Sequence, residues 1–360
     1  MKRLVCALLV FCLLLPMIAQ AETTYEKYTV SFFGSFDTVI SIIGYAQSMS
    51  TFEEVTAKAQ ERFHYYHQLF DIYNQYGELH NLWYVNQEAA KAPVQVPSEL
   101  FSLLQYAKEM YGPSLEMVNI ALGTVLAIWH QAREDSELDP ERAYLPELAE
   151  LEAANLHTDL DDLILDADAS TVFFQDPFMQ LDVGAVAKGY ATELVARQLL
   201  QGPMPSFAIN AGGNVRLGNP PLDGRANWGV AVQDPDGFAL ADPNSDVMDT
   251  LFLHNTSVVT SGDYQRYYIY QGERYHHIIS PDTLMPPQYF RSVTIITEDS
   301  GYADLLSTTL FLMPYEEGAE FVGNLPGVDA IWILNDRSMR MTDGIKDKAK
   351  SQGVTNPAQP

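Results

Sequence analysis

Residues 181–193 read L-D-V-G-A-V-A-K-G-Y-A-T-E, which predicts the end of a strand, a turn of small residues and the start of a helix. The first turn of a helix presents free backbone N–H groups and the positive end of the helix dipole, so it favours anions such as phosphate. Gly184 and Gly189 allow close approach, and Lys188 adds a mobile positive charge. These features predict a phosphate or carboxylate site. The segment matches neither the P-loop pattern nor G-x-G-x-x-G, so an ordinary strand–helix corner is the alternative.

The elements on the two sides of this stretch differ in kind. A predicted hairpin and mostly helices precede it, at residues 27–33, 38–45, 51–70, 97–112, 114–133 and from about 145. Short β-type runs follow it, at 206–210, 228–233, 251–260, 266–270, 274–279 and 291–297, with a helix at 301–313 and strands at 329–334 and 339–342. Helices followed by a mostly antiparallel sheet predict an α+β fold in a single large domain.

The first 21 residues have the pattern of a secretory signal peptide. Lys2 and Arg3 form a positive start, residues 4–15 are an apolar run, and residues 19–21 (A-Q-A) match a cleavage site. The apolar run is short for a transmembrane helix. We therefore expect an extracytoplasmic protein, periplasmic or at the cell surface, whose mature chain begins near residue 22.

The cysteines and the charge exclude several classes of function. Cys6 and Cys12 are the only cysteines and lie inside the predicted signal, so the mature chain would have no disulfide and no cysteine nucleophile. The chain has 21 basic and 47 acidic residues, and removal of the signal leaves 19 against 47, a net charge of −28. Such a surface repels nucleic acid, so we expect no nucleic-acid partner.

Two segments of the predicted sheet carry residues of chemical interest. A-I-N-A-G-G-N-V-R-L-G, residues 208–218, interrupts a strand with two glycines, which indicate a ligand-facing bulge or a plain hairpin turn. T-S-G-D-Y-Q-R-Y-Y, residues 260–268, is followed by R-Y-H-H-I-I-S-P, residues 274–281. No G-x-S-x-G elbow surrounds Ser261, so a serine hydrolase is not favoured. The adjacent histidines point to opposite faces of a strand, so only one can serve a given site.

A third segment, A-D-L-L-S-T-T at residues 303–309, lies at the start of a predicted helix. Asp304 and Thr308 are four residues apart and share one helix face. A carboxylate and a hydroxyl suit Mg²⁺, although a carbonyl, water or substrate phosphate must complete the octahedron. The alternative is structural, with an Asp favoured near a helix start and a Thr bonded back to the backbone.

In this order, the segments resemble the ApbE-type FAD:protein FMN transferases. The match is close for D-V-G-A-V-A-K-G-Y-A, G-G-N, T-S-G-D-Y-x-R-Y, H-I-I-x-P and A-D-x-L-S-T, and it covers about residues 30–335. The resemblance implies a T-fold-like flavin transferase domain at residues 22–345, and the polar end at 346–360 predicts a flexible tail. It also implies an enzyme that uses Mg²⁺ and FAD, transfers FMN to a Ser or Thr hydroxyl and releases AMP.

The family's site residues can be carried over one by one. Its metal ligands fall on the backbone carbonyl of Ala185 and on Asp304 and Thr308. Its FAD contacts fall on Asp182 and Lys188. The acceptors implied by the family are membrane redox subunits or secreted flavoproteins that carry a pattern like D-G-x-x-[ST]-x-A.

Four further residues match the family more loosely. His277 lies near an FAD contact and is our candidate for the base that activates the hydroxyl. Tyr73 in D-I-Y-N and Trp129 in A-I-W-H match aromatic FAD contacts, with core packing as the alternative. Thr38 ends F-D-T, which stands where the family has M-G-T.

One loop departs from the family pattern H-I-I-D-P-x-T-G. Ser280 replaces the Asp, and Leu284 stands where the glycine is common. Because a leucine does not easily adopt a positive φ, we expect this loop to turn differently.

The parts suggest how the reaction would run. Mg²⁺, Lys188 and backbone N–H groups would neutralise the diphosphate of FAD while a hydroxyl attacks the phosphorus that bears riboflavin. Two alternatives remain open. One is an FAD pyrophosphatase, with water as acceptor and FMN and AMP as products, and the other is a non-catalytic FAD-binding protein.

Overall fold

The computed structural model describes residues 24–112, 115–237 and 246–357, so the predicted signal peptide lies outside the described residues. At its centre is an eight-stranded antiparallel sheet with the order β1-β2-β6-β7-β10-β13-β14-β15. Its strands are β1 (Glu26–Ser35), β2 (Thr38–Ala46), β6 (Phe207–Ala211), β7 (Asn214–Leu217), β10 (Ser257–Gly262), β13 (Phe290–Thr297), β14 (Asp329–Leu334) and β15 (Met339–Met341).

Smaller sheets and helices surround this centre. The small sheets pair β8 (Trp228–Gln233) with β9 (Val247–Leu253), β11 (Tyr267–Tyr270) with β12 (Glu273–His276), and β5 (Thr171–Phe174) with β3 (Val94–Gln95) and β4 (Leu163–Asp166). The helices are α1 (Met49–Phe70), α2 (Leu82–Glu88), α3 (Ser98–Met110), α4 (Gly123–Leu138), α5 (Leu148–Asn155), α6 (Ala187–Gln201), α7 (Ser300–Phe311), α8 (Tyr315–Gly323) and α9 (Asp343–Lys346). The predicted α+β fold with a mostly antiparallel sheet is confirmed.

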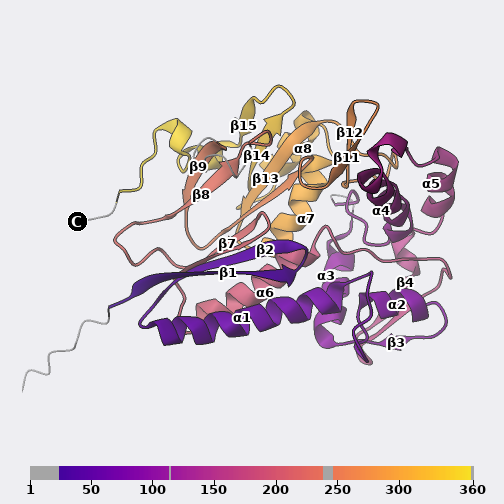
Figure 1. Cartoon of the computed structure of the whole chain (residues 1–360), viewed down its shortest axis with the longest axis horizontal. Helices are drawn as coiled ribbons and strands as arrows, with labels where there is room; N and C mark the ends of the chain where they lie inside the picture. Colours follow the sequence, from indigo (N-terminus) through magenta and orange to yellow (C-terminus); the bar gives the residue numbers. More distant parts are fainter. Residues whose placement is uncertain (1–23, 113–114, 238–245, 358–360) are drawn as a thin grey trace, which may run out of the picture.

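The two faces of the large sheet are covered differently. Alternate residues of a strand point to opposite faces, so Trp332 of β14 joins the large core with α1, α6 and α7, whereas its neighbours Ile331 and Ile333 join a second cluster with β8 and β9. Figure 1 shows α1 and α6 side by side along the helical face. A third cluster packs α4 and α5 against β11 and the loop after β12.

Helices α6 and α7 cross at a glycine. A Cβ added to Gly189 would lie 2.2 Å from the carbonyl oxygen of Ser300 and 2.5 Å from the Cβ of Asp304. Only a residue without a side chain permits this approach, because backbone atoms cannot move aside. The crossing brings the first turns of the two helices together.

Some predicted elements have other bounds in the structure than the sequence indicated. The helix predicted at 114–133 begins only at Gly123, because the preceding segment runs beside residues 180–182, with a Leu122–Gln180 bridge and an N–H of Asp182 donated to the carbonyl of Ile120. Where the sequence predicted a strand that ends at residue 181, the structure has only the isolated bridge between Leu122 and Gln180. Similarly, the run at 251–260 forms two strands, β9 and β10, separated by a turn in which Asn255 has a φ of 49°.

The segment predicted as a flexible tail packs against the domain over its described part. Ala349 is buried and bridges Leu251 of β9, and the hydroxyl of Ser351 donates to Asp249 at 2.6 Å. The N–H of Ser351 also donates to Asp249, at 2.9 Å, so the described part of this segment is tied to β9 although most of its polar side chains are exposed. Among the described residues, no helix is both long and apolar enough to cross a bilayer.

Replacing Gly189 by Ala should force α6 and α7 apart. We expect a loss of about 1–3 kcal/mol in the free energy of unfolding, the usual cost of overpacking a rigid contact, measured by urea denaturation. Gly323→Ala is the matched control, because a Cβ at that helical glycine meets no atom within 4 Å. It should leave stability unchanged or slightly raise it, and equal effects of the two changes would contradict the packing argument.

Candidate functional site

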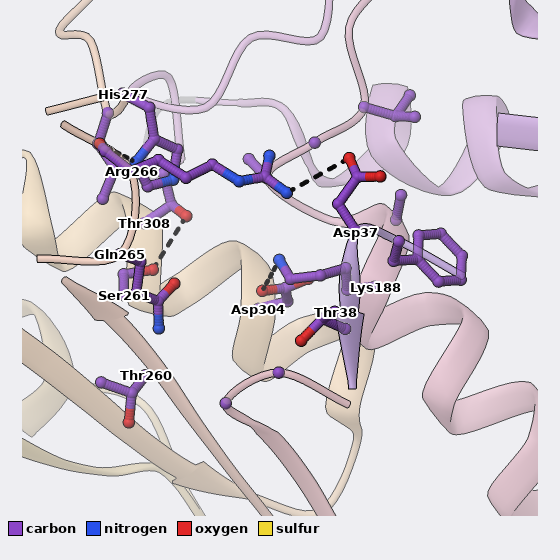
Figure 2. A pocket seen from close by; sticks show the side chains of 18 of the residues that line it. Asp37, Thr38, Lys188, Thr260, Ser261, Gln265, Arg266, His277, Asp304 and Thr308 are labelled. Atoms are coloured by element: carbon purple, nitrogen blue, oxygen red, sulfur yellow. Dashed lines mark hydrogen bonds and ion pairs between the residues drawn. The ribbon is translucent and has the colours of Figure 1, made fainter. Parts of the chain in front are cut away.

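A cavity of about 930 Å³ lies where α6 and α7 begin, beside α4 and the ends of several strands of the large sheet. Figure 2 shows residues from these separate elements pointing into it. The residues predicted for the site all line this one cavity: Thr38, Tyr73, Trp129, Asp182, Ala185, Lys188, His277, Asp304 and Thr308. Segments separated by more than 200 residues in the sequence therefore meet here.

Asp304 lies at the crossing of the two helices. Its Oδ2 accepts the backbone N–H of Gly189 at 2.8 Å, and its Oδ1 lies 4.0 Å from the Nζ of Lys188. Burial is the main effect on this carboxyl and raises its pKa, while the charge of Lys188 acts in the opposite direction. A buried carboxylate of this kind is stabilised in its charged form by a cation.

The oxygen ligands predicted for a metal fit that role. In the part of the chain that the structure describes, no N–H donates to the carbonyl of Ala185, because the Gly189 N–H that could reach back to it bonds Asp304 instead. Within the described ranges, the hydroxyl of Thr308 has only a 3.4 Å contact, with the hydroxyl of Ser261. Hard oxygen atoms of this type suit Mg²⁺. Within residues 24–112, 115–237 and 246–357, no cluster of three His, Cys, Asp or Glu could hold a metal alone, so substrate oxygens would have to complete the coordination.

Ser261 was considered in the sequence only as a weak nucleophile candidate, and its surroundings indicate another role. Its hydroxyl lies 2.8 Å from that of Ser307, which in turn donates to the backbone carbonyl of Asp304 at 2.9 Å. These bonds tie β10 to α7 beside Thr308. In the described residues no histidine bonds to Ser261, so the geometry does not support a serine hydrolase.

His277 presents one free ring nitrogen to the cavity. Its Nδ1 lies 3.2 Å from the carbonyl oxygen of Arg266, which can only accept, so Nδ1 carries the proton and Nε2 is left as an acceptor. Burial, followed by the charge of Arg266, lowers the pKa of His277 to about 3. The imidazole is therefore neutral at pH 7 and able to take up a proton.

Asp182 precedes the first turn of α6. Its Oδ1 accepts the N–H of Gly184 at 2.7 Å, and its own N–H donates to Ile120. Burial raises its pKa, against the effects of the Gly184 N–H and of His130. Asp182 thus shapes the small-residue turn that the sequence placed before the helix.

The two predicted aromatic residues differ in their surroundings. Trp129 is 4% exposed, and its Nε1–H donates to the carbonyl of Leu284 at 2.9 Å, so it packs in the third cluster and supports the cavity wall. Tyr73 is 55% exposed and stacks on His130, with ring centroids 4.7 Å apart. The sequence did not single out His130, which follows Trp129 directly and also lines the cavity.

Two hairpin tips form part of the cavity edge. In the β1–β2 turn, Phe36 and Asp37 both have positive φ, 54° and 51°, and the N–H of Phe36 donates to His67. In the β6–β7 turn, Gly212 has a φ of 59°, and a Cβ on it would lie 2.3 Å from the Oγ1 of Thr38. The G-G-N segment is therefore a hairpin turn, as one of its two interpretations predicted, and its two glycines line the cavity.

The loop after His277 corrects one expectation. Leu284 does adopt a positive φ, 57°, and its N–H donates to the carbonyl of Ser280 at 2.8 Å. Its side chain is buried against Trp129, and this packing offsets the backbone strain. The Ser280 hydroxyl accepts the N–H groups of Asp282 and Thr283, as an aspartate could.

A buried ion pair supports the crossing from behind. The carboxylate of Glu193 on α6 accepts the Nε–H of Arg216 on β7 at 2.9 Å and the N–H of Ser300, the first residue of α7, at 3.0 Å. Arg216 is 4% exposed. Nothing in the local pattern of the sequence identifies this partner of Arg216, which lies 23 residues away.

The fold and the cavity together define an α+β protein with one large cavity, lined by side chains of the large sheet and of the helices α4, α6 and α7. The model of the ApbE family matches residues 36–332, and the chain belongs to this family.

Relatives and solved structures agree with this membership. The chain is 32% identical to the FAD:protein FMN transferase of Klebsiella pneumoniae over 256 residues, 71% of this chain and 75% of that protein. It is 32% identical to the FAD:protein FMN transferase of Treponema pallidum over 279 residues, 74% of each chain. The crystal structure of the ApbE protein from Thermotoga maritima superposes with a TM-score of 0.77 at 26% identity, over 89% of this chain and 98% of that one.

Removing the carboxylate of Glu193 should leave Arg216 without its buried counter-ion. We expect Glu193→Ala to lower the free energy of unfolding by about 3–5 kcal/mol, measured by urea denaturation. The double variant Glu193→Ala/Arg216→Met should recover much of that loss, because no charge is then buried. A single variant within about 1 kcal/mol of the wild type would contradict this assignment.

Proposed function

We propose that the protein is an FAD:protein FMN transferase, which with Mg²⁺ moves FMN from FAD to a Ser or Thr hydroxyl of an acceptor protein and releases AMP. One observation carries the proposal: Ala185 and Lys188 at the start of α6 meet Asp304 and Thr308 of α7 in a single cavity. This convergence occurs in a member of the ApbE family whose curated relatives bear that enzyme name.

The cavity suits a dinucleotide. Its volume of about 930 Å³ is at the upper end of ordinary ligand pockets, which run from roughly 300 to 1,000 Å³. The exposed face of Tyr73 offers an aromatic surface at its edge, and Lys188 offers a charge for the diphosphate. A dinucleotide with two ring systems and a charged bridge needs both kinds of contact.

Two residues of the chain have a role in the reaction: one takes up the proton of the acceptor hydroxyl, and the other stabilises the negative charge that develops on the phosphate. The acceptor oxygen forms a bond to the phosphorus that bears riboflavin, the bond from that phosphorus to the AMP oxygen breaks, and the hydroxyl proton passes to Nε2 of His277. Because His277 is a weak base, proton transfer has to accompany P–O bond formation rather than precede it. Lys188 stabilises charge that develops on the phosphate oxygens.

The predicted metal would be held by the carbonyl of Ala185, the carboxylate of Asp304 and the hydroxyl of Thr308. When bound, Mg²⁺ supplies Lewis-acid stabilisation of the diphosphate. The predicted signal peptide supports an extracytoplasmic location, where membrane redox subunits or secreted flavoproteins would be the acceptors.

Two neighbouring threonines of α7 give a matched test of the metal site. Thr308→Val should reduce Mg²⁺-dependent FMN transfer at least tenfold, because it removes an oxygen ligand with little change in shape. Thr309→Val is the control, because Thr309 is buried and its hydroxyl donates to the carbonyl of Leu305 on its own helix. Asp304→Asn should abolish transfer, since its amide keeps an acceptor for Gly189 but not the charge. Full transfer by either site variant would contradict the metal assignment.

His277→Asn separates proton transfer from loop support. The asparagine amide can still donate to the Arg266 carbonyl, but it offers no basic nitrogen. We expect kcat to fall about 10²- to 10⁴-fold while the Kd for FAD changes little. Retained kcat would show that the acceptor hydroxyl loses its proton elsewhere.

The direct test mixes the protein with FAD, Mg²⁺ and an acceptor fragment that carries D-G-x-x-[ST]-x-A. Flavin fluorescence of the acceptor in a denaturing gel, the mass of one added FMN and equimolar AMP would support the transferase. Free FMN at turnover rates without acceptor would instead identify an FAD pyrophosphatase. FAD binding with no AMP release would identify a non-catalytic binding protein.

A further inference from the structure

Arg266, in the segment T-S-G-D-Y-Q-R-Y-Y, is a cation in the cavity to which the proposed mechanism assigns no role. It lies in the loop between β10 and β11, and its side chain extends across the cavity toward the β1–β2 hairpin tip (Figure 2). Its guanidinium lies 3.7 Å from the carboxylate of Asp37, and the two side chains are 47% and 79% exposed. An exposed pair at this distance is weak.

The other cations of the cavity wall have closer or additional partners. Of the Lys and Arg residues that line it, Lys188 faces the buried Asp304, and Arg133 bonds His130 at 2.7 Å and approaches Glu137 on its own helix. Among the described residues, the guanidinium of Arg266 has only the weak contact with Asp37. It is therefore the lining arginine or lysine most readily available to an incoming anion.

The position of Arg266 is central rather than peripheral. Its charge favours the ionised forms of Asp182 and Tyr73 and opposes protonation of His130 and His277, groups that belong to four separate segments. Its backbone is fixed, because its carbonyl accepts both the N–H and the Nδ1–H of His277, at 3.1 and 3.2 Å. The backbone of Arg266 is therefore held in place by hydrogen bonds, whereas its guanidinium makes only a weak contact within the described residues.

We propose that Arg266 is a substrate-binding residue whose guanidinium binds the diphosphate bridge of FAD, and that Asp37 is the counter-ion that holds it across the cavity before the nucleotide binds. This proposal rests on the proposed function, since it needs FAD as the ligand. A diphosphate offers paired oxygens to the planar guanidinium, which forms stronger bonds with them than with a distant, solvated carboxylate. Asp37 then acts as a competitor that lowers affinity for the nucleotide.

The test is a set of binding titrations on the full chain with FAD, ADP and riboflavin, in EDTA so that no turnover occurs. Arg266→Gln should weaken FAD and ADP about tenfold or more, as expected for loss of a charge-assisted contact. Riboflavin, which has no phosphate, should bind unchanged. Arg266→Lys should give an intermediate loss, because it keeps the charge but not the paired donors.

Asp37→Asn tests the counter-ion, and asparagine tolerates the positive φ at that position. It should tighten FAD about two- to fivefold, and this gain should be absent when Arg266 is already Gln. The matched control is the exposed pair Arg142 and Asp139, 3.5 Å apart and outside the cavity lining, for which Arg142→Gln and Asp139→Asn should change nothing.

The outcomes separate the two proposals. Wild-type affinity of Arg266→Gln for FAD and ADP would overturn the assignment, as would an equal loss for riboflavin, which would indicate a support role for the wall. A wild-type protein that binds FAD but transfers no FMN would overturn the transferase while leaving the Arg266 comparison valid. A wild-type protein that binds neither FAD nor ADP would overturn both.

Discussion

The contact between the N–H of Gly189 and the carboxylate of Asp304 is the constraint on which the site depends. It requires two helices to approach until no side chain fits between them. It also takes up the N–H that could otherwise bond the carbonyl of Ala185, a residue that lines the cavity. A single hydrogen bond between helices thus prepares two of the predicted metal ligands, and the buried pair of Glu193 and Arg216 supports the same crossing from the side of the sheet.

The electrostatics of the cavity contrast with those of the whole protein. The chain carries a formal charge of −26, yet Lys188, Arg133 and Arg266 all line this cavity. Burial raises the pKa of both Asp182 and Asp304, so each carboxylate is more stable as an anion when a cation lies beside it. The lining also includes four aspartates, so an anionic ligand would have to meet these cations at defined positions, because general electrostatic attraction by the protein is absent.

The sequence predicted the elements and the site well where chemistry and periodicity coincide. The hairpin at 27–45, the helix of Asp304 and the late strands follow from alternation and helical spacing, and the motif residues do meet in one cavity. The prediction failed where contacts between distant segments determine the backbone conformation. An apolar run from residue 114 resembled a helix, but its backbone pairs with residues 180–182. Leu284 adopts a conformation that its type disfavours because its buried side chain holds it there, and no local pattern shows that contact.

The packed segment beyond residue 346 has a consequence for the order of assembly. Ile345 and Ala349 complete the cluster beneath β8 and β9, more than 110 residues after β8 enters the chain. During synthesis this cluster remains incomplete until these late residues are made. Its apolar side chains therefore stay partly exposed, and favour aggregation, until nearly all of the polypeptide has emerged.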